Sequence, residues 1–200
     1  MRIKLIASCW VLGLCALTAT AQMPMDGTKK GPTAGAVIEP SKAVDSQLNI
    51  IESQLMGVVK AMPAEKYGFA PSSAIFVSGQ TTEFAKVRTF AEQAAHVAEA
   101  NYFFYSMVSG MKPDVDMGAI AKLTKKDEIV AALAGSFAFA HKSVATLTPA
   151  NAFEGIQSRE LGMQTRATLA TFGVAHAYDH YGQLVEYLRM NGIVPPASAK

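Results

Sequence analysis

Cysteine is scarce in this sequence. Only two cysteines, Cys9 and Cys15, occur among 200 residues, and both lie in an N-terminal segment that we expect to be removed. A mature chain without cysteine forms no disulfide bond and has no thiolate to act as a nucleophile or as a metal ligand. Lipidation of Cys15 is disfavoured because the bulky Leu14 precedes it.

An excess of charge of either sign is also absent. Charged residues make up 17% of the chain, and without Arg2 and Lys4 the 18 basic residues fall to 16, which balance 16 acidic ones. The lysine pairs at 29–30 and 125–126 are too few to form a basic surface, so we expect no nucleic-acid binding. Half of the residues are hydrophobic, which is ample for the core of a single domain.

The first 21 residues have the pattern of a secretory signal peptide. Arg2 and Lys4 form a short basic region, and residues 5–17 form an apolar run that is too short to span a membrane comfortably. Residues 19–21, Ala-Thr-Ala, match a cleavage site before Gln22. We therefore predict a signal peptide over residues 1–21 and an exported protein, either periplasmic or secreted.

No strand of any length, internal repeat or glycine-rich phosphate loop is found in the sequence. Residues 22–42 are rich in Pro, Gly, Thr and Ala and are predicted to be a flexible linker, followed by one domain over residues 43–200. Ser41 is expected to cap a first helix that Pro63 ends. Apolar residues recur along this helix at spacings of three and four: Val44, Leu48, Ile51, Leu55, Val58 and Met62.

A second helix is predicted over residues 89–109. Thr89 and Glu92 form a capping box at its start, and Gly110 stops it. The segment before it, residues 63–88, has no long period and is expected to be a loop with at most a short helical turn. On the helix, His96 shares a face with three apolar side chains, those of Ala100, Phe103 and Met107.

Two further helices are predicted in the second half of the chain. Residues 111–123 read as a connection, and a weaker capping sequence at 124–127 opens the third helix. Its expected buried stripe consists of Ile129, Leu133, Phe137, Ala140, Val144 and Leu147.

The fourth helix is expected to start near Thr165 and to end at Gly192, with Ile193 packing back onto its last turn. Four amphipathic helices favour an all-α, antiparallel four-helix bundle.

Three histidines are candidates for a metal site. His176 and His180 are four residues apart, so their imidazoles share one face of the fourth helix, and His96 lies on the second helix. No Glu follows His176, which excludes a zincin-type HExxH motif. Three protein ligands with an open position are typical of catalytic zinc sites, and imidazole also suits nickel, iron or copper. The alternative is that these histidines only flank the core.

Three segments resemble the DinB-like superfamily: MPAEKYGFAP after the first helix, VRTFAEQAAHVAEAN in the second, and HAYDHYGQLVEYLRMNGIVPP at the end. The resemblance implies a four-helix bundle that holds a divalent metal through His96, His176 and His180. His141 matches no ligand of the family. The family name comes from induction by DNA damage and implies no DNA binding.

The resemblance and the residues together predict an exported protein that binds a divalent metal, zinc or nickel first, with iron or manganese as alternatives. The expected activity is metal-dependent hydrolysis or group transfer on an unknown small molecule. Some relatives use a low-molecular-weight thiol, but a signal peptide would remove this chain from the cytosolic thiol pool. Asp179, Glu99 and Gln183 are candidates to support the ligands. The alternative is a non-catalytic metal-binding or structural bundle, and a homodimer stays open.

Overall fold

A computed structural model of the chain describes residues 32–72 and 87–199. The predicted signal peptide and residues 22–31 of the predicted linker lie outside these residues. The chain divides into two units, residues 1–36 and 37–200. In the first, the described residues contain a turn closed by a hydrogen bond from the Ala36 amide to the Thr33 carbonyl. The second unit holds every helix and strand assigned within the described residues.

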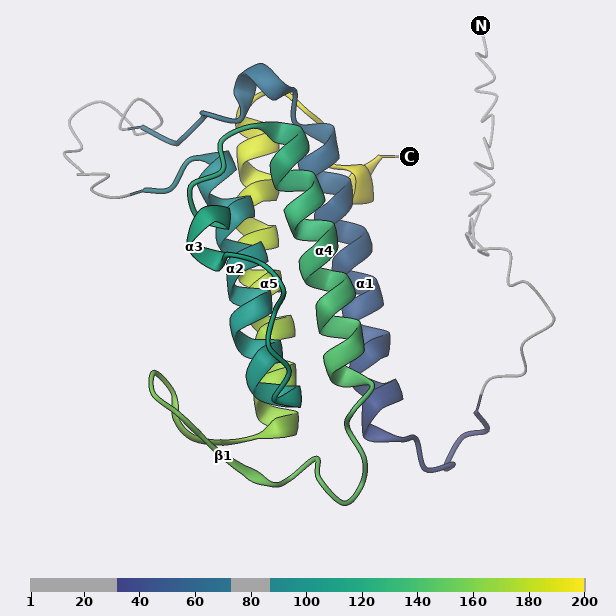
Figure 1. Cartoon of the computed structure of the whole chain (residues 1–200). Helices are drawn as coiled ribbons and strands as arrows, with labels where there is room; N and C mark the ends of the chain where they lie inside the picture. The colour runs from purple at the N-terminus through teal and green to yellow at the C-terminus, as the bar shows by residue number, and fades with distance from the viewer. Residues whose placement is uncertain (1–31, 73–86, 200) are drawn as a thin grey trace, which may run out of the picture. The chain divides into compact units, whose positions relative to one another are not determined.

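Four long helices form a bundle, as predicted: α1 (Pro40–Ala61), α2 (Phe90–Ser109), α4 (Lys126–Val144) and α5 (Arg166–Met190). Each helix packs against two others, in the cyclic order α1, α4, α2, α5. Figure 1 shows that α1 and α5 run in one direction and that α2 and α4 run in the other. The predicted antiparallel arrangement therefore holds for the neighbouring pairs α2–α5 and α1–α4, whereas α2–α4 and α1–α5 are parallel. The α2–α4 connection travels back along the bundle, which makes this topology possible.

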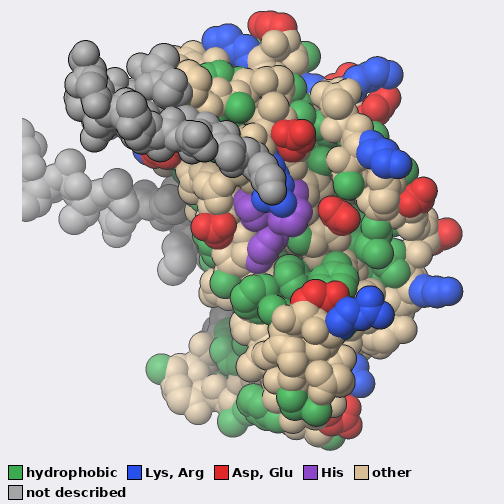
Figure 2. Space-filling view, turned by 90° about the vertical axis from the view of Figure 1, so that its left-hand side faces the viewer, with side chains coloured by type: hydrophobic (Ala, Val, Ile, Leu, Met, Phe, Trp, Pro, Cys, Tyr) green, Lys and Arg blue, Asp and Glu red, His purple; other side chains and the backbone are tan. Residues whose placement is uncertain are grey.

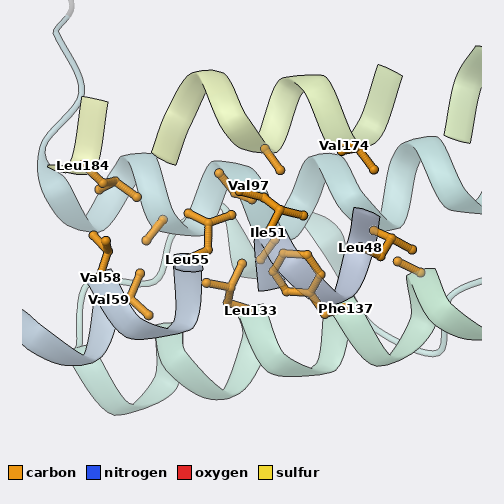
Figure 3. Close-up of a cluster of buried hydrophobic side chains, with 14 of the residues drawn as sticks. Leu48, Ile51, Leu55, Val58, Val59, Val97, Leu133, Phe137, Val174 and Leu184 are labelled. Carbon is orange, nitrogen blue, oxygen red and sulfur yellow. The ribbon is translucent and has the colours of Figure 1, made fainter. Parts of the chain in front are cut away.

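The core confirms the predicted apolar stripes. All six apolar positions predicted on the first helix are buried, from Val44 to Met62, and so are all six predicted on the third, from Ile129 to Leu147. Figure 3 shows side chains of α1, including Ile51 and Leu55, meeting Leu133 and Phe137 of α4 together with Val97, Val174 and Leu184. Full burial of such a side chain contributes roughly 1.5–3 kcal/mol to the free energy of folding, so the packing of these apolar side chains between the helices is the main source of the stability of the bundle.

The helix starts agree with prediction where a capping box is present and differ where it is not. Thr89 and Glu92 cap α2 reciprocally, and α2 ends at Ser109 before Gly110, whose φ is 74°. Thr165 caps α5 through Thr168. The predicted cap at Ser41 was wrong: α1 begins at Pro40, whose fixed φ suits the first turn of a helix.

The predicted cap of the third long helix was also wrong. The residue before α4 is Lys125, and no side chain caps this end. Instead the Lys126 ammonium donates to the carbonyls of Lys60 and Met62 at the end of α1, at 2.8 Å each. These bonds satisfy carbonyls that the end of a helix leaves without partners, and they place a positive charge where the helix dipole favours one. The start of α4 is therefore held against the end of α1 by a tertiary contact, while its own first amides have no side-chain cap.

Short elements fill the connections. The expected helical turn after α1 is the 3₁₀ helix η1 (Ala64–Lys66), and the α2–α4 connection contains a one-turn helix, α3 (Met117–Ile120), capped by Asp116. The expectation of no strand was wrong, because β1 (Gly155–Ser158) and β2 (Gly162–Thr165) form a small antiparallel hairpin before α5. None of the described helices has both the length and the apolar character of a membrane span.

The end of α5 is closed as predicted. Gly192 has a φ of 72°, its amide bonds to the Arg189 carbonyl, and the Ile193 amide bonds to the Leu188 carbonyl. These two bonds make a Schellman motif, in which a left-handed glycine lets the chain turn back over the last helical turn. A final 3₁₀ turn, η3 (Pro196–Ser198), then packs against α1.

Candidate metal centre

The candidate centre lies between α2 and α5, which run antiparallel and close together. Gly173 allows this approach: a Cβ at that position would lie 2.8 Å from the Tyr105 hydroxyl and 2.9 Å from its ring. The same hydroxyl donates to the Ala170 carbonyl at 3.1 Å, which links the two helices. Antiparallel contact between the helices brings the first half of α2, with His96, opposite the middle of α5.

The three predicted histidines meet at this contact. Their nitrogen atoms lie within 4.8 Å of one another, and the Nε2 atoms of His176 and His180 are 3.1 Å apart. The His96 ring lies 5.1 Å from that of His176 and 4.9 Å from that of His180, centre to centre. Two nitrogens about 2.0–2.1 Å from one zinc at a tetrahedral angle would be about 3.3 Å apart, close to the spacing seen here.

Burial keeps the imidazoles neutral. Desolvation lowers the pKa of His96 to about 4, with the positive charge of Arg88 as a second cause. Desolvation likewise lowers the pKa of His180 to about 4 and lowers that of His176. A neutral imidazole offers a lone pair to a metal, whereas an imidazolium does not. The three histidines are therefore in the binding-competent protonation state at neutral pH.

The donor set also has unmet hydrogen-bonding capacity. The Nδ1 atoms of His176 and His180 are buried and have no partner among the described residues. Buried polar atoms are rarely left without a partner. The two Nε2 atoms face each other and share one hydrogen bond at 3.1 Å, and an ion between them would replace that bond. The residues present therefore fit a divalent metal ion.

Two hollows open beside the histidines. A polar hollow of about 400 Å³ is lined by Val87, Arg88, Glu92, His96, Glu99 and Ala121. A second hollow of about 310 Å³ is mostly apolar and shares His96 and Glu99 with the first; its other lining residues are Ala100, Phe103, Phe104, Met117, Glu160 and His176. Figure 2 shows histidine side chains reaching the surface, with acidic side chains around them. A small molecule could therefore reach the centre from two sides.

The three residues expected to support the ligands are near the centre but differ in their contacts. Glu99 is the nearest, with a carboxylate oxygen 4.0 Å from Nδ1 of His96. Gln183 donates to Asp179 at 2.9 Å, so these two side chains are paired with each other. The charge of Asp179 acts on the imidazoles through space, opposing the desolvation that lowers the pKa of His176.

Two residues near the centre were missed from the sequence. Gln93 is buried, and its side-chain amide donates to the Gln183 carbonyl oxygen at 2.5 Å. This hydrogen bond joins α2 to α5 three residues away from His96 and His180. Arg88 precedes the cap of α2 and contributes a positive charge to the polar hollow. Gln93 lies three residues before His96 on α2, a helical spacing that could have identified it, whereas Arg88 precedes the helix and shows no such spacing.

His141 lies in a different part of the bundle, as its lack of a match to the family ligands implied. Its Nδ1 is 2.5 Å from Asp45 and its Nε2 is 3.1 Å from Glu52, both on α1. Burial by itself would lower the pKa of His141, but the hydrogen bonds and negative charges of the two carboxylates raise it. His141 therefore links α4 to α1 through these two interactions. The sequence showed it only as a residue beside the buried stripe.

Comparison with known proteins identifies the family. The model of the DinB superfamily matches residues 47–184, and the chain belongs to this superfamily. A crystal structure of a protein from Exiguobacterium sibiricum assigned to the DinB family has the same fold, with a TM-score of 0.56 and 17% identity over 78% of this chain and 95% of that one. None of the curated proteins compared matches the chain significantly. The predicted family and fold are thus confirmed.

Proposed function

We propose that this protein is an exported metalloenzyme of the DinB superfamily that holds one divalent metal ion through His96, His176 and His180. The observation that carries the proposal is the convergence of three neutral, half-buried to buried imidazoles within 4.8 Å beside an open hollow. Three neutral ligands leave the full charge of the ion for a fourth partner, whereas carboxylate ligands would reduce it. Zinc or nickel suits this donor set best, with iron or manganese as alternatives.

The proposed reaction is hydrolysis or group transfer on a small molecule. A bound metal would supply Lewis acidity and lower the pKa of a coordinated water towards about 7. Glu99, which lines both hollows, is placed to accept a proton from a reacting group or to orient His96. The mature chain would have no cysteine, so the nucleophile must be water or an external group, which leaves a thiol substrate open.

The first test is metal content. Protein purified from its native compartment should carry about one equivalent of metal, and His96→Ala, His176→Ala and His180→Ala should each abolish stoichiometric binding because two donors hold an ion weakly. His141→Ala is the matched control, since it removes a histidine far from the centre and should leave the metal in place. Equal metal content in all four variants would refute the site.

The second test separates an enzyme from a binding protein. Small esters, amides and thiol-transfer substrates are screened with metal-loaded and chelator-treated protein side by side. Turnover that needs the metal supports the enzyme. Identical behaviour of the two forms on every substrate, with the loaded form fully metallated, favours the alternative of a non-catalytic metal-binding bundle.

A further inference from the structure

The wall of the polar hollow follows a regular spacing. Glu92, His96 and Glu99 succeed one another at spacings of four and three residues, so they lie along one face in the first half of α2. Arg88 lies immediately before the Thr89 cap of this helix and lines the same hollow. The positive charge of Arg88 is a cause of the lowered pKa of His96, so the hollow holds a cation within electrostatic reach of the histidines.

Arg88 is a charge of this hollow without an ion-pair partner among the described residues. Glu92 lines the same hollow, but its carboxylate accepts hydrogen bonds from the Thr89 amide at 2.7 Å and the Thr89 hydroxyl at 3.0 Å, and the charge of Arg88 acts on it only through space. The backbone of Arg88 is fixed by the Tyr187 hydroxyl, which donates to its carbonyl at 3.0 Å. Within the described part of the chain, Arg88 therefore offers a guanidinium that is not engaged by a carboxylate.

The second hollow is mostly apolar. It is lined by Ala100, Phe103, Phe104 and Met117, together with the carboxylates of Glu99 and Glu160. Aromatic and aliphatic side chains bind apolar groups. Each hollow has two carboxylates, but among the described lining residues only the first has a cation, Arg88. The two hollows meet at His96 and Glu99, so a ligand that spans them would place an anionic group at Arg88 and an apolar group in the second hollow.

We propose that the substrate is a small organic anion with an apolar end, and that Arg88 determines this specificity by binding its anionic group. The apolar end occupies the hollow over Phe103 and Phe104, which places the middle of the molecule at the three histidines. The position of the reacting atom rests on the function proposed above, whereas the pairing of an anion with Arg88 does not. Arginine suits this role because its planar guanidinium binds a carboxylate through two parallel hydrogen bonds.

The test compares two probes that differ in charge alone, 3-phenylpropionate and 3-phenylpropanamide. Their binding to the metal-loaded protein is measured by calorimetry for wild type, Arg88→Gln and Arg88→Lys. Arg189→Gln is the matched control, because Arg189 is an exposed arginine of α5 paired with Glu186. We expect wild type to prefer the carboxylate, Arg88→Gln to lose about tenfold for the carboxylate and nothing for the amide, and Arg88→Lys to recover part of the loss. Arg189→Gln should match wild type.

Several results would overturn the proposal. They are equal binding of the two probes to wild type, no binding of the carboxylate, or unchanged carboxylate binding in Arg88→Gln. Carboxylate binding that survives Arg88→Gln but disappears in His176→Ala would place the anion on the metal instead. The metal content of every sample is measured independently. If the protein takes up no metal, the proposed function is refuted. The dependence of carboxylate binding on Arg88 can still be measured in that case, with the metal-free protein.

Discussion

At the scale of single residues, the imidazoles of the centre differ from an ordinary histidine in their affinity for protons. Metal binding requires a deprotonated imidazole, so protons and metal compete for the same nitrogen atoms. Histidines with an ordinary pKa near 6.5 would begin to lose a metal below about pH 7. Here burial lowers the pKa of His96 and His180 to about 4, and that of His176 is lowered too. Because of these lowered pKa values, protons compete with a metal for the imidazoles only in more acidic solution.

We therefore expect the decline of the apparent metal affinity to begin at a lower pH than at a site of ordinary histidines, and to be steep as the pH approaches about 4. A competition titration with a chromophoric chelator, corrected for protonation of the chelator, measures this profile. An affinity that already declines near pH 6.5 would show that the imidazoles are not shielded as the structure indicates.

His141 should respond to pH in the opposite sense. Its folded pKa is raised by Asp45 and Glu52, so the folded chain binds a proton more tightly than the unfolded chain does. The resulting stabilisation is fully present below the unfolded pKa of about 6.5 and is lost as the pH rises through the folded pKa. His141→Asn should lower the free energy of unfolding by about 1 kcal/mol at pH 5.5, the order expected for a partly exposed ion pair, and by less at pH 9.

Urea denaturation of wild type and His141→Asn at the two pH values measures the difference. Other titrating groups contribute equally to both proteins and cancel. A difference that is the same at pH 5.5 and pH 9 would mean that His141 contributes by packing and hydrogen bonding without its charge.

At the scale of helices, the contact between α2 and α5 depends on a glycine. Gly173 faces the buried ring of Tyr105, and a Cβ there would lie closer than van der Waals contact allows. Gly182 lies in the same helix with nothing within 4 Å of an added Cβ. The two glycines therefore form a natural pair for separating packing from helix propensity.

Gly173→Ala should destabilise the protein by roughly 1–3 kcal/mol, because the ring of Tyr105 must move. Gly182→Ala should stabilise it by about 0.5–1 kcal/mol, because alanine is a better helix former than glycine. Urea denaturation measures both. A metal titration should also show weaker binding in Gly173→Ala alone, since this change pushes α5 away from His96. Equal stabilisation by the two substitutions would contradict the close contact.

Sequence and structure agree best where the determinant is local. The capping box of Thr89 and Glu92, the HxxxH spacing and the glycine that ends α5 involve residues a few positions apart, so each could be read directly. The cap predicted at Thr124 does not form, and the start of α4 is held instead by the bonds of Lys126 to α1, a contact between distant segments. The hairpin at 155–165 was missed because its strands of four residues are too short to show a period. The pairing of His141 with Asp45 and Glu52 depends on the register of two helices, which no local pattern contains.

At the scale of the whole molecule, the signal-peptide pattern of the N-terminal segment predicts that the protein is exported. Residues 1–21 should be removed between Ala21 and Gln22 when the protein is produced in its native host. Intact-mass measurement of the exported protein gives the site directly, and a cytosolic sample serves as the unprocessed control. Exported protein that retains Cys9 and Cys15 would contradict cleavage and would point to an anchored form.

The arrangement of the ligands also determines when in the life of the chain a metal can be acquired. His96 lies near the middle of the sequence, while His176 and His180 lie on α5, the last long helix to be synthesised. A chain still lacking α5 has one imidazole of the three, and the two parts must close a long loop before the site exists. No ion can be held until that late step is complete. If the chain is exported before it folds, the metal in the centre is therefore drawn from the supply outside the cytosol, and the ions available there select which one it is.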